Sequence, residues 1–177
     1  MESEQLATAL QRLQTVLERR PASGRVHDEP AMARWHGAAR VSTRHANGTE
    51  LHTDLPAELG GSGTQVSPGW LLRAALAGCV TTRIAMLAAS AGIDLDRLEV
   101  EAHSQSDLNG LLGLSDENGL LPSAGPLAAR LLVRIAAPGV SSERLRQLVE
   151  QGQALSPVSG ALAHCVPLSL DIEVADT

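Results

Sequence analysis

The longest apolar stretch of the chain covers 67–92, with the sequence SPGWLLRAALAGCVTTRIAMLAASAG. Ser67 and Pro68 are residue types that favour the start of a helix, and Gly92 favours its end. The pattern therefore predicts one long helix that is apolar on nearly all sides. A single thiol, Cys79, lies at its centre, and most of what the sequence predicts about function depends on that thiol.

The N-terminal segment has a different pattern. Between residues 4 and 20, leucines recur at i, i+4, i+7 and i+11 with polar residues between them, which is the spacing of one helix face. These leucines are Leu6, Leu10, Leu13 and Leu17. Pro21 ends the expected helix, and a linker is expected to follow it. We therefore expect an N-terminal amphipathic helix and linker over 1–31, and one folded domain over 32–177.

Alternating apolar and polar residues predict strands in the rest of the chain. The alternation is clearest over 97–105, and Asn47-Gly48 is a hairpin-turn signal. The expected elements are a hairpin over 35–55, strands over 97–105, 130–137 and 166–174, and a loop or a poorly formed hairpin over 107–127. A helix is expected to begin at Ser141 or Ser142 and to bury Leu145, Leu148 and Val149. In the last strand, one face carries Val166, Leu168, Leu170, Ile172 and Val174.

This order of elements predicts an α+β fold. A helix that is apolar nearly all round needs cover on every side, whereas one small antiparallel sheet covers only one side. A second copy of the chain is the simplest source of the missing cover. We therefore predict an obligate homodimer with the helices that carry Cys79 at its centre.

Composition and charge narrow the classes of partner. The net charge is −6, and no run of arginines is dense enough to follow a phosphate backbone, so we expect no nucleic-acid partner. Arg73 and Arg83 lie inside the apolar helix, which disfavours a membrane span. The first residues lack the pattern of a secretory signal, so we expect a cytoplasmic protein. The six histidines show no metal-ligand spacing.

Three segments carry a combination of motifs: a Gly-Gly loop, a Ser-Pro helix start, an Ala-rich helix with a central cysteine, and a late Pro-Val-Ser turn. The segments are DLPAELGGSGTQVSPGWLLRAALAGC over 54–79, LEVEAHSQSDLNGLLGL over 98–114 and SPVSGALAHCVPLSLDIEV over 156–174. Together they resemble proteins of the OsmC/Ohr family. The resemblance extends over about 35–175 and leaves out the N-terminal helix.

The resemblance implies an intertwined homodimer, in which sheets from both chains wrap two central helices. It also implies the reduction of organic hydroperoxides by a pair of cysteines, with no metal or organic cofactor. Cys79 matches the peroxidatic cysteine of the family. The position of the resolving cysteine is Ser156 in this chain, so a hydroxyl replaces the second thiol.

Two further family features involve charged residues. A glutamate that often follows the helix-start proline is Gly69 here. The family's arginine from the N-terminal hairpin corresponds best to Arg40, and Arg34 and Arg44 are the alternatives. The expected catalytic residues are therefore Cys79 and Arg40.

Two interpretations of Cys79 remain open from the sequence. Free cysteine is often a small, buried packing residue. As a peroxidatic thiol it would react as a thiolate, which Arg83 or Arg40 would stabilise, and an external thiol would reduce its sulfenic acid. Cys165 is expected to pack at the entry to the last strand, and its alternative role is that of a substitute resolving thiol. The alternative function is a non-catalytic module of the same fold that binds a small apolar or thiol-reactive ligand.

Overall fold

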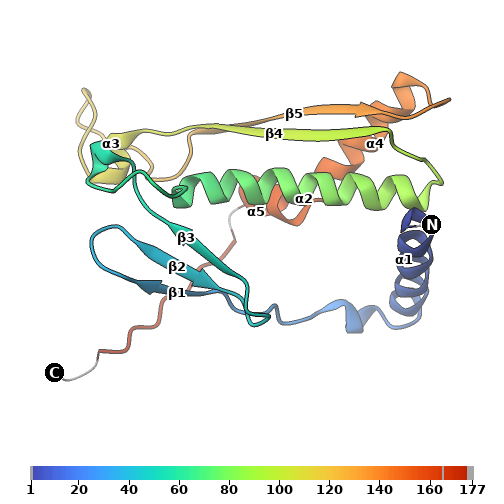
Figure 1. The fold of residues 1–177 in the computed structure, drawn as a ribbon, viewed down its shortest axis with the longest axis horizontal. Helices are drawn as coiled ribbons and strands as arrows, with labels where there is room; N and C mark the ends of the chain where they lie inside the picture. The colour runs from blue at the N-terminus through green and yellow to red at the C-terminus, as the bar shows by residue number, and fades with distance from the viewer. Residues whose placement is uncertain (1, 165, 175–177) are drawn as a thin grey trace.

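One long helix extends through the middle of the molecule, between a two-stranded sheet and a separate three-stranded sheet (Figure 1). The computed structural model describes residues 2–164 and 166–174. Both sheets are antiparallel, and helices are mixed with strands along the chain. The predicted α+β class is therefore confirmed.

The long helix, α2, spans Pro68–Ser90, as the apolar stretch predicts. The Ser67 hydroxyl caps it by accepting a hydrogen bond from the backbone N–H of Trp70 at 3.2 Å. Gly92 follows the helix with a φ of +64°, a conformation that glycine adopts without strain. Both ends of α2 are thus set by the residues that mark them in the sequence.

The two-stranded sheet lies along α2. Strands β4 (Arg97–Gln105) and β5 (Ala128–Ala136) pair in antiparallel register. The apolar residues of β4 pack against the core, and its polar residues other than Ser104 are exposed. On the exposed face Glu101 forms an ion pair with Arg134 of the neighbouring strand. The connection between the strands, predicted as a loop, contains one short helix, α3 (Leu108–Leu112).

Two helices cover a second side of α2. They are α4 (Ser142–Ala154) and α5 (Pro157–Ala163), and both pack on α2. Leu145 and Leu148 are buried as predicted, whereas Val149 is only half-buried. The sequence predicts only a turn where α5 forms. The buried core consists of Leu76, Val80, Ile84, Ala88 and Leu148.

Gly152 shows how closely α4 approaches α2. A Cβ atom added to Gly152 would lie 2.5 Å from Cγ1 of Ile84, which is fully buried and has no room to move. We expect Gly152→Ala to lower the free energy of unfolding by about 1–3 kcal/mol through overpacking. Urea unfolding followed by circular dichroism measures this change. Gly160→Ala in α5 is the matched control, because an added Cβ there meets no atom within 4 Å, and we expect no loss of stability.

The three-stranded sheet is a meander of short strands, β1 (Met32–Trp35), β2 (Val41–Arg44) and β3 (Glu50–Thr53). The turn at Asn47-Gly48 is present as predicted, with Gly48 at a φ of +92°. A second turn at Gly37-Ala38 joins β1 to β2, and it is not predicted from the sequence. The predicted hairpin is therefore one part of a three-stranded sheet.

A tight loop connects this sheet to α2. The short 3-10 helix η2 (Ala57–Leu59) precedes Gly60 and Gly61, and a Cβ on Gly61 would collide with the Leu55 carbonyl. The buried Asp54 carboxylate holds the loop by accepting hydrogen bonds from the Ser62 hydroxyl, the Ser62 N–H at 2.7 Å and the Leu55 N–H at 2.8 Å. The Gly-Gly pair thus permits the close turn that leads into the long helix.

The hydrogen bonds to Asp54 predict a specific pH dependence. The Ser62 hydroxyl, followed by the backbone N–H groups, lowers the pKa of Asp54 below its ordinary value. The ionised carboxylate therefore stabilises the fold above the unfolded-state pKa of about 3.9, and this contribution is lost as pH falls through the lower folded value. We expect Asp54→Asn to be less stable than the wild type at pH 7, with a smaller difference at pH 3. Thermal melts across this range test the prediction, with Asp28→Asn in the exposed linker as the control.

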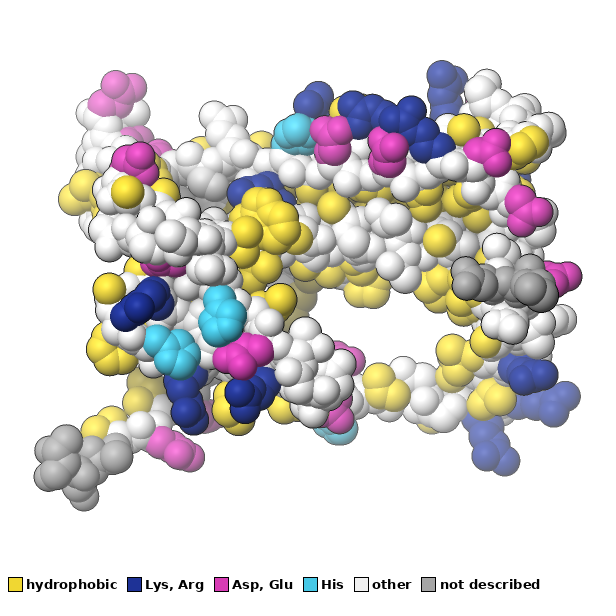
Figure 2. Space-filling model, viewed as in Figure 1, with side chains coloured by type: hydrophobic (Ala, Val, Ile, Leu, Met, Phe, Trp, Pro, Cys, Tyr) yellow, Lys and Arg dark blue, Asp and Glu magenta, His cyan; other side chains and the backbone are white. Residues whose placement is uncertain are grey.

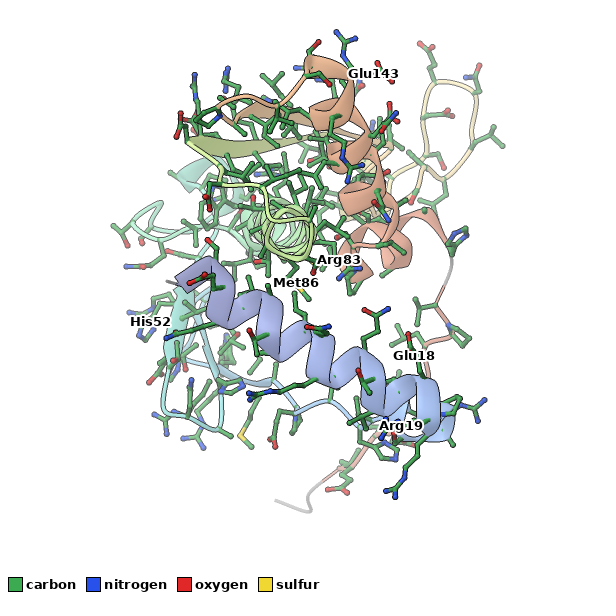
Figure 3. All side chains as sticks on the ribbon, turned by 90° about the vertical axis from the view of Figure 1, so that its right-hand side faces the viewer. Glu18, Arg19, His52, Arg83, Met86 and Glu143 are labelled. Atoms are coloured by element: carbon green, nitrogen blue, oxygen red, sulfur yellow. The ribbon has the colours of Figure 1, made fainter. Side chains whose placement is uncertain are left out.

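The N-terminal helix, α1 (Glu2–Arg19), confirms the predicted amphipathic helix, and a 3-10 turn, η1 (Pro21–Gly24), follows it. It crosses the C-terminal end of α2, and Met86 extends from α2 toward it (Figure 3). The leucine stripe is only partly covered, since Leu13 remains 55% exposed.

The predicted strand over 166–174 does not form in the single chain. Residues 166–174 have no assigned strand and lead away from the body of the molecule (Figure 1). A strand needs a neighbour for its backbone hydrogen bonds, and this segment has no pairing partner among the described residues. Its apolar face is correspondingly exposed, with Leu168 at 97%.

Candidate active site around Cys79

Cys79 lies at the centre of α2 as a free, half-buried thiol. It borders the buried ridge that contains Leu76 and Val80. Residues three and four positions apart share a helix face, so Leu72, Leu76 and Arg83 lie on the same flank of α2 as Cys79. The thiol is thus at the margin of the core and not inside it.

A cavity of about 180 Å³ opens on this flank, one helical turn before Cys79. Its apolar wall includes Leu72 and Leu76 from α2, Leu127 before β5, and Leu162 from α5. Its polar lining residues are Arg73, His103 and Ser104. The cavity has the mixed lining that suits a small organic molecule with one polar end.

The two arginines of α2 have different surroundings. Arg73 donates a hydrogen bond from Nη1 to the Ser104 hydroxyl at 3.2 Å. Arg83, one turn beyond Cys79, forms no hydrogen bond or ion pair with any residue in the described part of the chain, and its Nε atom is buried. Figure 3 shows Arg83 on the side of α2 that faces α5. The unpaired positive charge nearest to the thiol along α2 is therefore that of Arg83.

The single chain does not bring Arg40 to Cys79. Arg40 lies beside the turn between β1 and β2, donates to the carbonyl of His36 at 3.3 Å and lines a cavity with Asp54. Figure 1 shows its sheet apart from α2. Of the alternatives, Arg44 forms an ion pair with Glu50 at 3.0 Å. The pairing of Arg40 with Cys79 stays a prediction.

The two positions that depart from the family pattern are both at helix starts. Ser156 is 2% exposed and caps α5, because its hydroxyl accepts from the Ser159 N–H at 3.5 Å. Gly69 is in the first turn of α2, where an added Cβ would meet no atom closer than 3.9 Å. Cys165, the other thiol of the sequence, lies outside the described residues.

Two features of this site are not predicted from the sequence, the contact between Arg73 and Ser104 and the helix that follows Ser156. The helix after Ser156, α5, could have been predicted, because Ser156-Pro157 repeats the Ser-Pro start of α2. The described residues contain no group of three or more His, Cys, Asp or Glu able to hold a metal ion.

Comparisons with solved structures place this architecture among known folds. An OsmC-like protein from Mycoplasma pneumoniae is 14% identical, with a TM-score of 0.65 over 80% of this chain and 91% of that chain. An organic hydroperoxide resistance protein, OsmC, from Legionella pneumophila is 21% identical, with a TM-score of 0.56 over 78% and 90%. A Vibrio cholerae protein named for organic hydroperoxide resistance, with captopril in one of its active sites, is 28% identical, with a TM-score of 0.52 over 78% and 85%.

The search of curated proteins found no match to this sequence. A family profile described as OsmC-like protein matches residues 61–171, which is more than half of the chain. The matched range contains the central helix with Cys79, the two-stranded sheet, and both helices, α4 and α5, that pack on α2. The chain belongs to the OsmC-like protein family.

Proposed function

We propose that this protein reduces organic hydroperoxides in defence against oxidative stress, with Cys79 as its peroxidatic thiol. The observation that carries the proposal is a free, half-buried thiol on the same flank of α2 as a largely apolar cavity. Similarity to proteins named for organic hydroperoxide resistance supports it. The cavity beside Leu72 and Leu76 accepts the organic group, and the peroxide oxygens face the thiol.

The first chemical step is a two-electron oxidation of sulfur. The Cys79 thiolate attacks one peroxide oxygen, a sulfur–oxygen bond forms, and the oxygen–oxygen bond breaks. The hydroperoxide leaves as the alcohol after it takes up a proton, and Cys79 becomes a sulfenic acid. The positive charge of Arg83, one turn away on the same flank, stabilises the thiolate.

The second step requires a thiol from outside the chain. Ser156 offers a hydroxyl where the family has its resolving cysteine, and a hydroxyl cannot form a disulfide with the sulfenic acid. An external thiol therefore attacks the Cys79 sulfur, a mixed disulfide forms and water leaves. A second external thiol then releases Cys79 as the reduced thiol.

The proposed working form is an obligate homodimer. Only 22% of the most apolar 18-residue window of α2 is buried in the single chain, although this helix, alone among those described, is long and apolar enough to cross a membrane. Figure 2 shows an opening through the molecule between α2 and the linker that follows α1. A second copy that fills this space covers α2, pairs residues 166–174 as a strand, and brings an Arg40 side chain to each Cys79.

A trapping experiment tests the proposed chemistry. The reduced protein is mixed with one equivalent of cumene hydroperoxide and then with dimedone, which labels sulfenic acids. We expect mass spectrometry of the digested protein to find dimedone on Cys79, together with one equivalent of cumyl alcohol. An unmodified Cys79 with unconsumed hydroperoxide would contradict the proposal and would favour the non-catalytic binding module.

A further inference from the structure

Two buried polar side-chain atoms on facing helices, α2 and α5, lack hydrogen-bond partners among the described residues. They are Nε of Arg83 and the hydroxyl oxygen of Ser159. Ser159 is only 7% exposed, and its backbone N–H is already used in capping α5, so its hydroxyl is the group left unpaired. Buried polar groups are nearly always hydrogen-bonded in folded proteins, and the exceptions need an explanation.

Packing places both atoms at the same level of α2. Leu162 of α5 lines the cavity together with Leu72 and Leu76, whereas Gly152, near the end of α4, approaches Ile84. The first turn of α5 lies between these two contacts along the chain. Along the axis of α2 it therefore lies beside the turn from Cys79 to Arg83. Ser159 is the most buried residue of α5, and α5 is covered on the side that packs on α2 and α4. Its hydroxyl therefore lies in the interface that Arg83 borders.

The missing partner must accept hydrogen bonds and balance a positive charge. No carboxylate in the described part of the chain pairs with Arg83. The other α2 arginine, Arg73, is already paired with Ser104, and the Ser156 hydroxyl is used as a helix cap. An anionic oxygen that forms on the neighbouring Cys79 would meet both requirements.

We propose that Arg83 and Ser159 donate hydrogen bonds to the oxygen of the Cys79 sulfenate and hold this intermediate until an external thiol arrives. This inference rests on the function proposed above. In the first step, thiolate and hydroperoxide give sulfenate and alcohol, and the sulfur loses the two electrons that cleave the oxygen–oxygen bond. In the second, the sulfenate takes a proton and reacts with a low-molecular-weight thiol, which gives a mixed disulfide and water.

Arg83 and Ser159 protect the Cys79 sulfenate from further oxidation. With Ser156 in place of a second thiol, the sulfenate is not removed by an internal disulfide and must survive a bimolecular encounter. Hydrogen bonds to its oxygen withdraw electron density from the sulfur–oxygen group. They thereby slow the attack of the sulfenate sulfur on a second hydroperoxide, which would give the sulfinic acid that thiols do not reduce.

Over-oxidation of Cys79 tests the inference. Wild type, Arg83→Gln and Ser159→Ala are exposed to excess cumene hydroperoxide without thiol, and mass spectrometry follows the sulfenic form, trapped with dimedone, and the sulfinic form over time. We expect each variant to convert sulfenate to sulfinate at least fivefold faster than the wild type. Arg83→Lys, which keeps the charge and a donor, is expected to recover part of the protection. Arg146→Gln in α4 and Ser90→Ala at the end of α2 are the controls and are expected to behave as the wild type, because both side chains are exposed and neither lines the cavity beside Cys79.

The outcomes separate this inference from the proposed function. If every variant forms the sulfenate on Cys79 and over-oxidises at the wild-type rate, the roles of Arg83 and Ser159 are wrong and the hydroperoxide reduction stands. Variants that lose only dimer stability, with unchanged over-oxidation, overturn the inference in the same way, because Arg83 then pairs with the other copy. If the wild type forms no sulfenate, the proposed function and the inference both fail.

Discussion

Cys79→Ser is expected to lose all hydroperoxide-dependent oxidation of a dithiol, down to the rate of buffer alone. Serine fills nearly the same space in the half-buried site of α2, but a hydroxyl cannot be oxidised to a sulfenic acid. The loss therefore comes from the missing sulfur and not from a change of fold. The measurement is the consumption of cumene hydroperoxide in the presence of dithiothreitol, with circular dichroism as the check on folding.

Cys165→Ser is the matched control, because it removes the other thiol of the sequence. We expect it to keep the wild-type rate and to form no new disulfide. If Cys165→Ser loses turnover, or peroxide treatment links Cys79 to Cys165, then Cys165 is a resolving thiol and the external-thiol step is wrong. Full turnover by Cys79→Ser would remove the basis of the proposed mechanism.

Leu170→Asp is expected to break the proposed dimer. Leu170 is 81% exposed in the single chain, on the face that residues 166–174 would bury against a second copy. Burial of a leucine side chain contributes about 1.5–3 kcal/mol, and each dimer buries two copies, so the dissociation constant should rise at least about 100-fold. Analytical ultracentrifugation of both proteins at micromolar concentration measures the change.

The neighbouring residue provides the control for the Leu170 variant. Ser169→Asp adds the same carboxylate to the opposite face of the segment, which alternation leaves in solvent. We expect this variant to stay dimeric. A wild-type protein that sediments as a folded monomer, or equal effects of the two substitutions, would contradict the strand pairing that we propose.

The sequence predicts the elements whose determinants are local. Ser67 and Gly92 fix the ends of α2 through a cap and a left-handed turn, and both effects involve residues within one turn of the helix end. The alternation over 97–105 predicts which side chains of β4 face the core. The short helix α5 is missed because seven residues are too few to show a helical period, although its Ser-Pro start is recognisable.

Features that depend on distant contacts are not predictable in this way. Alternation identifies residues 166–174 as strand-forming, but the segment pairs with no strand among the described residues of one chain. A strand needs the free edge of another strand for its hydrogen bonds, and the alternation pattern does not say where that edge is. The unpaired atoms of Arg83 and Ser159 depend on how α5 packs on α2. Of the candidate site, the sequence predicts only Cys79, because a cysteine in an apolar helix can be recognised without knowing its neighbours. The residues around it come from four elements, α2, β4, β5 and α5, whose packing the sequence pattern does not show.

The positions of the two tryptophans make intrinsic fluorescence a measure of the state of this protein. Trp35 and Trp70 are its only tryptophans, and it has no tyrosine or phenylalanine. Trp35 is tied to its own sheet through a hydrogen bond from its indole N–H to the Ala38 carbonyl at 2.8 Å. Trp70 is 47% exposed at the start of the helix that carries Cys79, and we expect the proposed second copy, which would cover this helix, to shield it from water. In Trp35→Phe, all intrinsic indole fluorescence therefore comes from one side chain, whose emission wavelength reports assembly of the active site without any added label.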